Sequence, residues 1–224
     1  MVFLHEGDMA TRTPRTPRTP RARPRVGSID GRQVVVLDDV ISKSKVDKLT
    51  LALKEAPFRR SEYARPDTRE LRHWAVDLRQ IGAALCDPFV EVTAREVERY
   101  FGPGRDLHRA YCNVALFGDM LVTHTDSAPE ANLVTALWYI CTDWDAEWGG
   151  ETLFFDQHKD AALVVSPRPG RVVLFDGAIP HVGRPPNRIC YEPRFSVAIK
   201  FRPPAGKRDH APQATSKRGP RPAR

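Results

Sequence analysis

The chain places a histidine and an aspartate two residues apart, at His124 and Asp126, where strand-forming residues give way to a proline-bearing loop. Residues two apart on a strand project from the same face, so the imidazole and the carboxylate are predicted to point the same way. Together they offer one nitrogen and one oxygen ligand to a metal ion. The triplet alone is a weak signal, because a surface histidine followed by a capping aspartate has the same sequence.

A third ligand is available at His181, which follows the strand-like run 171–175 and lies in a proline-rich turn. Two histidines and one carboxylate bind one face of a metal ion and leave the opposite face open. This ligand set is typical of non-haem Fe(II) oxygenases. The other histidines of the chain are His5, His73, His108, His158 and His210.

Short β-rich runs dominate the chain from residue 108 onward, and turn-forming stretches such as WGG and RPPN separate them. Their spacing predicts an antiparallel sandwich or jelly roll. The runs are 108–118, 132–140, 151–155, 162–165, 171–177 and 194–202.

Before these runs, the region of about 40–102 is predicted to supply helical support, preceded by a strand at Val34–Val36. One helix begins near Ser44 and places Val46, Leu49 and Leu53 on one face, and a second runs on both sides of Pro88. Helices followed by a run of strands indicate an α+β fold in which the N-terminal helices brace one sheet.

The formal charge of +7 is unevenly distributed. Residues 1–25 carry six arginines against two acids, a net +4, and residues 202–224 carry seven Lys or Arg against one acid, a net +6, which leaves −3 for the rest. Because both ends are rich in proline and poor in apolar residues, 1–25 and 205–224 are predicted to be disordered basic tails on one domain, 26–204. We interpret them as solubilising tails in preference to an arm for nucleic acid.

The four cysteines are widely spaced and form no Cys-x-x-Cys pair. Buried free thiols in a reducing cytoplasm explain such spacing best. No run approaches the roughly 18 apolar residues of a membrane helix, and the N-terminus has no signal-peptide pattern. We therefore expect a cytoplasmic protein with no membrane partner and leave its oligomeric state open. The cysteines are Cys86, Cys112, Cys141 and Cys190.

Beyond the triad, an ordered series of motifs resembles the Fe(II)/2-oxoglutarate-dependent dioxygenases, and most of all their prolyl 4-hydroxylase-type branch. The series reads HTD, WGGETLFFD, SPRPGRVVLFDGAIPH and RFSVAIKF. The separation of 57 residues between His124 and His181 fits that family, and so does Gly118, six residues before the first ligand. The resemblance runs from Tyr111 to Phe201, about half of the chain, and an ordered series is far more specific than one triplet.

This resemblance implies a double-stranded β-helix, the jelly roll, with Fe(II) held by His124, Asp126 and His181 and chelated by 2-oxoglutarate. O₂ would oxidise an unactivated C–H of a substrate by hydrogen abstraction, with release of succinate and CO₂. Asp126 also implies a hydroxylase, because halogenating relatives carry a small residue in its place. Desaturation and ring formation remain alternative outcomes.

The far carboxylate of 2-oxoglutarate needs a cation, and a guanidinium can bind a carboxylate through two charge-assisted hydrogen bonds. Arg194 opens the last strand-like run, Ser196 shares its face, and the resemblance assigns this Arg-x-Ser pair to the carboxylate. The spacing after His181 is longer than is usual in the prolyl 4-hydroxylase-type branch, so Arg188 and Lys200 remain alternatives.

Further polar residues are predicted to line the pocket. Tyr111 and Asn113 share one strand face and are candidates for binding 2-oxoglutarate. Thr135, Leu137 and Tyr139 share another, and Thr135 is the third candidate. For each polar side chain, a role as a satisfied core residue is an equally good interpretation.

The substrate is less well indicated than the chemistry. We predict a small-molecule hydroxylase acting on an amino acid or biosynthetic intermediate, because the chain is compact and its core is slightly acidic. The alternatives are a protein hydroxylase of the prolyl type, a nucleic-acid oxidative demethylase and a non-catalytic jelly roll that binds a ligand. The segment 58–74 is predicted to be an arginine-rich loop over the barrel mouth. Its arginines are candidates for binding a carboxylate- or phosphate-bearing substrate, and a solvated charged loop is at least as good an interpretation.

Overall fold

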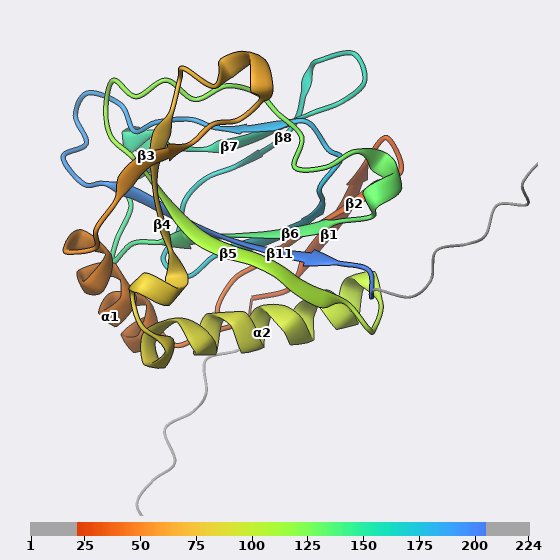
Figure 1. The fold of residues 1–224 in the computed structure, drawn as a ribbon, viewed down its shortest axis with the longest axis horizontal. Coiled ribbons are helices and arrows are strands. Elements are labelled where there is room, and N and C mark those ends of the chain that lie inside the picture. Colours follow the sequence, from red (N-terminus) through yellow and green to blue (C-terminus); the bar gives the residue numbers. More distant parts are fainter. Residues whose placement is uncertain (1–21, 205–224) are drawn as a thin grey trace, which may run out of the picture.

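Residues 22–204 are described by the structure, a computed structural model, and form two β-sheets and two α-helices (Figure 1). The large sheet has the strand order β1-β2-β9-β6-β11-β5-β4-β3, and the small sheet has the order β10-β7-β8. The predicted jelly roll is confirmed. The strands are β1 (Arg25–Ile29), β2 (Arg32–Leu37), β3 (Arg59–Glu62), β4 (His73–Asp77), β5 (Asp106–Ala115), β6 (Val134–Ile140), β7 (Thr152–Phe155), β8 (Ala161–Val165), β9 (Val172–Asp176), β10 (His181–Gly183) and β11 (Arg194–Arg202).

Strand β11 lies near the centre of the large sheet, hydrogen-bonded to β5 on one side and to β6 on the other. Its residues alternate between two faces, as a strand with both faces covered requires. One face carries the polar side chains Arg194, Ser196 and Lys200, and the opposite face is continuously apolar. The polar face of β11 looks toward the small sheet, so it lies inside the jelly roll.

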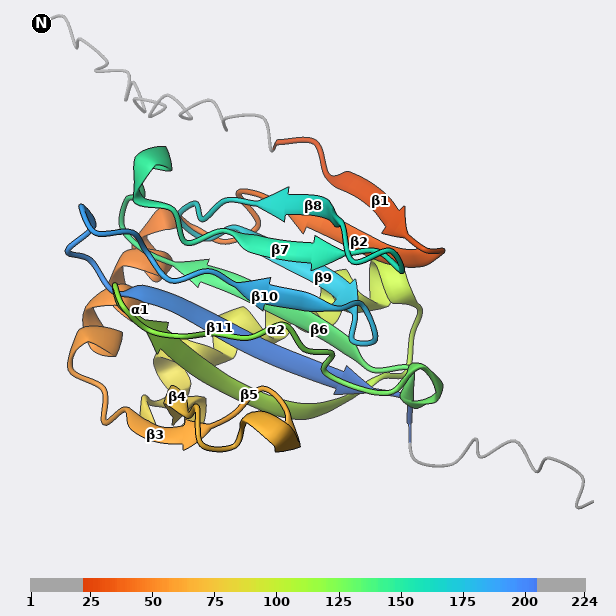
Figure 2. The same cartoon turned by 90° about the horizontal axis from the view of Figure 1, so that it is seen from above.

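The apolar face of the large sheet is covered by α1 (Lys43–Lys54) and α2 (Ala83–Phe101), which lie side by side beneath it (Figures 1 and 2). Phe89 of α2 meets the ring of Trp138 edge-on, with centroids 5.2 Å apart. The indole nitrogen of Trp138 donates to Thr93 Oγ1 over 2.8 Å, so the one polar atom of this buried ring is satisfied. These contacts confirm that the helices brace one sheet.

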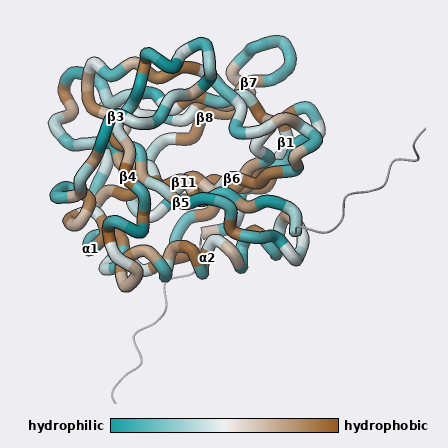
Figure 3. Tube along the Cα trace, viewed as in Figure 1, coloured by the Kyte–Doolittle hydropathy of each residue, from teal (hydrophilic) through white to brown (hydrophobic). Residues whose placement is uncertain are grey.

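A second apolar cluster fills the space between the two sheets. It joins Phe154 of the small sheet to Phe175 of β9, whose ring centroids are 5.0 Å apart, and to Tyr139 of β6. Figure 3 shows hydrophobic colour concentrated in β6 and β11 at the centre of the fold. These aromatic contacts pack the small sheet against the large one.

The predicted helical support of 40–102 is wrong in its middle part. The segment 58–74, which we expected to be a loop, contains β3 and β4, and these strands extend the large sheet beyond β5. Their sequence is polar because β3 is an edge strand with exposed side chains, so it lacks the apolar alternation that marks a half-buried strand. One contact between β3 and β4 is of the cation–π type: the Arg60 Cζ lies 5.9 Å from the centre of the Trp74 ring.

Strand β1 was also not predicted, although a signal for it exists. Asp30 and Gly31 connect β1 to β2 and both have positive φ, 49° and 75°. A two-residue Asp-Gly turn of this kind is the strongest local sign of a β-hairpin.

All four cysteines are buried and free, as predicted. No helix within residues 22–204 is long and apolar enough to cross a membrane. The predicted basic tail 205–224 and residues 1–21 of the N-terminal one lie outside the described residues, whereas Arg25, which we placed in that tail, is the first residue of β1. The domain limits 26–204 stay a prediction.

Candidate metal centre

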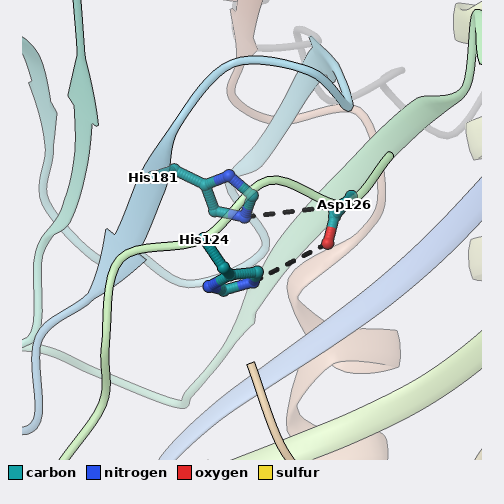
Figure 4. Close-up of side chains that lie close together, drawn as sticks. All are labelled: His124, Asp126 and His181. Carbon is teal, nitrogen blue, oxygen red and sulfur yellow. Dashed lines mark ion pairs between the residues drawn. The ribbon is translucent and has the colours of Figure 1, made fainter. Parts of the chain in front are cut away.

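The three predicted ligands meet at one point (Figure 4). His181 is the first residue of β10, and His124 lies opposite in the segment between β5 and β6. The two histidines are joined by a pair of backbone hydrogen bonds of 3.0 and 2.9 Å, and the Asp126 N–H donates to the Gly177 carbonyl over 2.7 Å. One ligand atom from each of the three side chains lies within 4.8 Å of the others.

Two details of this placement differ from the prediction. His181 was expected in a loop, but it pairs with Phe154 in the antiparallel β10–β7 ladder. His124 was expected at the end of a strand, but only one isolated bridge, to His181, holds its backbone. Both His124 and Asp126 nevertheless face the same site.

Each histidine is held in the tautomer that a metal requires. Nδ1 of His124 lies 3.1 Å from the Val122 carbonyl oxygen, and Nδ1 of His181 lies 2.9 Å from the Ile179 carbonyl oxygen. A carbonyl only accepts hydrogen bonds, so both Nδ1 atoms carry a proton, and in the neutral ring the lone pair is on Nε2. Fixing a ring through its second nitrogen is how metal-binding histidines are usually oriented.

The ring of His181 is packed among aromatic side chains. Phe154 stacks on it with centroids 5.8 Å apart, and Phe175 meets it edge-on at 4.7 Å. Burial lowers the pKa of His181 to about 4, so the imidazole is neutral near pH 7. A neutral imidazole is the form that binds a metal ion.

The carboxylate of Asp126 is buried and accepts two hydrogen bonds. Thr135 Oγ1 donates to Oδ2 over 2.6 Å, and Lys200 Nζ donates to Oδ1 over 2.8 Å. Burial opposes the charge of Asp126, but His181 and Lys200 more than offset it and hold the pKa of Asp126 well below its usual range. The third ligand is therefore ionised.

A cavity of about 260 Å³ opens beside the triad. All eight residues that we predicted for the site line it: His124, Asp126, His181, Arg194, Ser196, Tyr111, Asn113 and Thr135. It is bounded by β5, β6, β11 and β10, so the jelly roll itself forms its walls. The structure thus brings together residues that span 86 positions of the chain, from 111 to 196.

Arg194 is buried in the wall of this cavity, and its guanidinium is only partly satisfied. Nε donates to the Gly150 carbonyl over 2.5 Å, Nη2 to Thr152 Oγ1 over 3.0 Å, and Nη1 to Ser196 Oγ over 3.2 Å. A guanidinium has five N–H groups, so one on each Nη has no protein partner. Among residues 22–204 no carboxylate lies within 4 Å of it, and a buried cation without a counter-ion is costly unless an anion joins it.

Two glycines make room for this guanidinium. A Cβ at Gly183 would lie 3.2 Å from both Nη atoms, and one at Gly150 would lie 3.2 Å from the Arg194 Cδ and 2.9 Å from the Trp144 ring. Gly183 is two residues along β10 from His181, about 6.6 Å at the usual strand rise. The cation and the metal ligands are thus separated by roughly the length of a short dicarboxylate.

The charged residues in and around the cavity differ from the prediction in several places. Lys200 was an alternative partner for the co-substrate, but it contacts Asp126. Arg188 does not line the cavity, and neither do the five arginines of 58–74. Glu62 and Arg109 form an ion pair at the rim, with bonds of 2.5 and 3.0 Å, that was not predicted.

Fold and site together define a class of protein. Two imidazoles and one carboxylate form a mononuclear metal site with an open face. A buried cation in the same jelly-roll cavity is suited to a carboxylate ligand beside that metal.

Comparisons with known proteins agree with this class. Residues 110–202 match the sequence model of the 2OG-Fe(II) oxygenase superfamily. No curated protein matches the chain in sequence. The resemblance predicted from the motifs of this segment is confirmed by this match. Fe(II) and 2-oxoglutarate, the predicted cofactors, are those that give the superfamily its name.

Solved structures show the same fold at low sequence identity. The epimerase SnoN from nogalamycin biosynthesis is 17% identical over 76% of each chain, with a TM-score of 0.57. A Pseudomonas putida prolyl-4-hydroxylase is 18% identical over 76% of this chain and 92% of its own, with a TM-score of 0.58. HygX from Streptomyces hygroscopicus, with nickel and 2-oxoglutarate bound, is 15% identical over 76% and 82%, with a TM-score of 0.60.

Removing one imidazole should weaken metal binding without unfolding the protein. We predict that His181→Ala lowers the affinity for Co(II) at least about a hundredfold, because one of three ligands is lost. Calorimetric titration of the metal-free protein measures this affinity. His158→Ala, which removes an exposed imidazole in the β7–β8 turn, is the matched control and should bind like the wild type. Equal affinities in both variants would place the metal elsewhere.

Proposed function

We propose that the chain is an Fe(II)- and 2-oxoglutarate-dependent oxygenase that hydroxylates an unactivated C–H of a small molecule, with release of succinate and CO₂. The observation that carries this proposal is the pairing of two features in one cavity. The His124, Asp126 and His181 ligand atoms converge on one side, and the unmatched N–H groups of Arg194 face the same space.

In this proposal the triad holds the iron. His124 and His181 supply Nε2 lone pairs, because the carbonyls of Val122 and Ile179 hold the proton of each neutral ring on Nδ1. Thr135 fixes the rotation of the Asp126 carboxylate through its 2.6 Å hydrogen bond. Bound iron and 2-oxoglutarate together supply an oxidant for C–H hydrogen abstraction. Asp126 fills the position that halogenating relatives leave small, which supports hydroxylation.

Arg194 binds the far carboxylate of 2-oxoglutarate through its two unmatched N–H groups. Ser196 and Thr152 hold the guanidinium in plane, and each hydroxyl oxygen accepts one of its N–H bonds. The ring of Tyr139 lies 5.3 Å from the Arg194 Cζ and its hydroxyl lies 2.7 Å from Thr152 Oγ1, which adds a second layer of support. A fixed guanidinium loses less freedom on binding a carboxylate than a mobile lysine does.

The remaining predicted residues line the space between these two ends. Asn113 pairs with Ser196 across β5 and β11, and its buried Oδ1 has no hydrogen-bond partner in the described chain. An unmatched buried oxygen calls for a donor, which a bound water or ligand supplies. Tyr111 packs beside Lys200 on the same wall. We assign both to the lining of the co-substrate pocket.

A small molecule fits this cavity better than a polymer does. The cavity of about 260 Å³ is hollowed into the jelly roll and must hold 2-oxoglutarate as well as the substrate. Similar structures include enzymes of antibiotic biosynthesis and prolyl hydroxylases, so the fold supports both kinds of substrate. The depth of the triad supports a substrate that enters as a whole.

The role of Arg194 is tested by the binding of 2-oxoglutarate. We predict that Arg194→Gln weakens 2-oxoglutarate binding to the Zn(II)-loaded protein about a hundredfold or more, because a bidentate charge-assisted pair is lost. Calorimetry measures this affinity. Co(II) affinity should stay within about threefold of wild type, which shows that the variant is folded.

The matched control is Arg188→Gln, an exposed arginine outside the cavity, which should bind 2-oxoglutarate like the wild type. Unchanged affinity in Arg194→Gln, or equal losses in both variants, would contradict the assignment.

The reaction type is tested by isotope incorporation. The Fe(II) protein is incubated with 2-oxoglutarate, ¹⁸O₂ and a panel of amino acids and other small carboxylic acids, and succinate release identifies the substrate. For hydroxylation we expect the product to gain one oxygen atom that carries the ¹⁸O label. A product that loses two hydrogens and gains no label would show desaturation or ring formation instead.

A further inference from the structure

The charges that line the cavity do not balance once the cofactors are bound. The lining contains three cations, Arg109, Arg194 and Lys200, and two anions, Glu62 and Asp126. Burial lowers the pKa of His73, which also lines the cavity, so this imidazole adds no charge near neutral pH. Fe(II) and the 2-oxoglutarate dianion add equal and opposite charges. One positive charge is left unmatched.

Pairing the groups one by one locates this charge. Glu62 forms an ion pair with Arg109 at the rim. In the proposed function, which this step rests on, Arg194 is taken by the far carboxylate of 2-oxoglutarate. The two positive charges of the iron are balanced by Asp126 and by the near carboxylate of 2-oxoglutarate. Lys200 keeps no anion of its own, because its partner Asp126 now neutralises the metal.

Lys200 is placed to bind a second ligand. In register it stands opposite Thr135 of β6 and Arg109 of β5, and all three residues line the cavity. Its side chain is 13% exposed, and Nζ lies 5.5 Å from the centre of the Tyr111 ring. An ammonium has three N–H donors, of which Asp126 takes one over 2.8 Å.

The cavity that contains Lys200 also has large apolar side chains in its lining. Tyr63, Leu71 and Met120 all line the cavity, and their side chains are left 48%, 42% and 66% exposed. Large apolar side chains gathered around a pocket mouth mark a place where a ligand covers them. The combination is a cation in the depth and an apolar surface at the mouth.

We propose that Lys200 binds the carboxylate of the substrate and that the substrate is a monoanionic carboxylic acid with an apolar body. The single unmatched positive charge favours a carboxylate over a dianionic phosphate. The apolar body lies against Tyr63, Leu71 and Met120. Since Lys200 touches a metal ligand, the carbon that is oxidised lies within a few bonds of the carboxylate.

A pair of matched probes tests this inference. Hexanoate and hexanamide have the same chain and differ in charge, and saturation-transfer NMR measures the affinity of each for the Zn(II)- and 2-oxoglutarate-loaded protein. We expect the wild type to bind hexanoate about tenfold more tightly than hexanamide, because only the carboxylate gains a charge-assisted bond. Lys200→Gln should remove this preference and leave hexanamide affinity unchanged.

Two further variants complete the design. Lys200→Arg keeps the charge and should retain the preference, and Lys45→Gln, which removes an exposed lysine of α1, should behave like the wild type. Equal binding of the two probes by the wild type would overturn the inference. So would a hexanoate preference that survives in Lys200→Gln, or displacement of 2-oxoglutarate by hexanoate.

Failure of the proposed function is seen separately, before either probe is added. A wild-type Zn(II) protein that shows no saturation transfer to 2-oxoglutarate contradicts the co-substrate assignment itself. Retention of 2-oxoglutarate without any hexanoate preference contradicts only the role of Lys200.

Discussion

The site depends on the pair of backbone hydrogen bonds between His124 and His181. They tie a long segment without regular structure to the first residue of the short strand β10. The bridge sets the distance between the two imidazoles, whose ring centres lie 4.5 Å apart. Asp126 is then fixed by its own backbone bond to Gly177, at the end of β9. The metal ligands thus come from two segments, the one between β5 and β6 and strand β10, that are far apart in the sequence and meet in the fold.

Desolvation gives these side chains their chemical state. Burial keeps His181 neutral, and the charges around Asp126 keep it ionised, so both are ready to bind a cation without a change in protonation. Burial also makes Arg194 costly unless an anion joins it. In the proposed function, the same low-polarity interior therefore selects a metal cation at one point and a carboxylate at another. Ligand binding offsets part of the free-energy cost of burying these charged groups.

The sequence predicted the parts whose pattern is local. The alternation in 194–202 gave the strand β11 and the shared face of Arg194 and Ser196, and the ordered motifs gave the triad. Strands β3 and β10 were missed because one is polar at a sheet edge and the other is three residues long and next to prolines. Neither carries the period on which strand prediction relies.

Contacts across the sheet were beyond the reach of the sequence. Lys200 and Arg194 are an even number of residues apart on β11, so the sequence predicts that their side chains share one face of the strand. It does not predict the residue with which Lys200 forms an ion pair. That partner, Asp126, is 74 residues away and is reached only because β11 lies beside β6. The Glu62–Arg109 pair at the rim depends in the same way on the unpredicted strand β3.

The most direct test of the account is the visible spectrum of the protein with Fe(II) and 2-oxoglutarate under anaerobic conditions. Chelation of iron by the keto acid produces a weak charge-transfer band that neither component gives alone. The account predicts that this band appears and saturates at one iron and one 2-oxoglutarate per chain. A folded protein that binds iron but gives no band on addition of 2-oxoglutarate would contradict it.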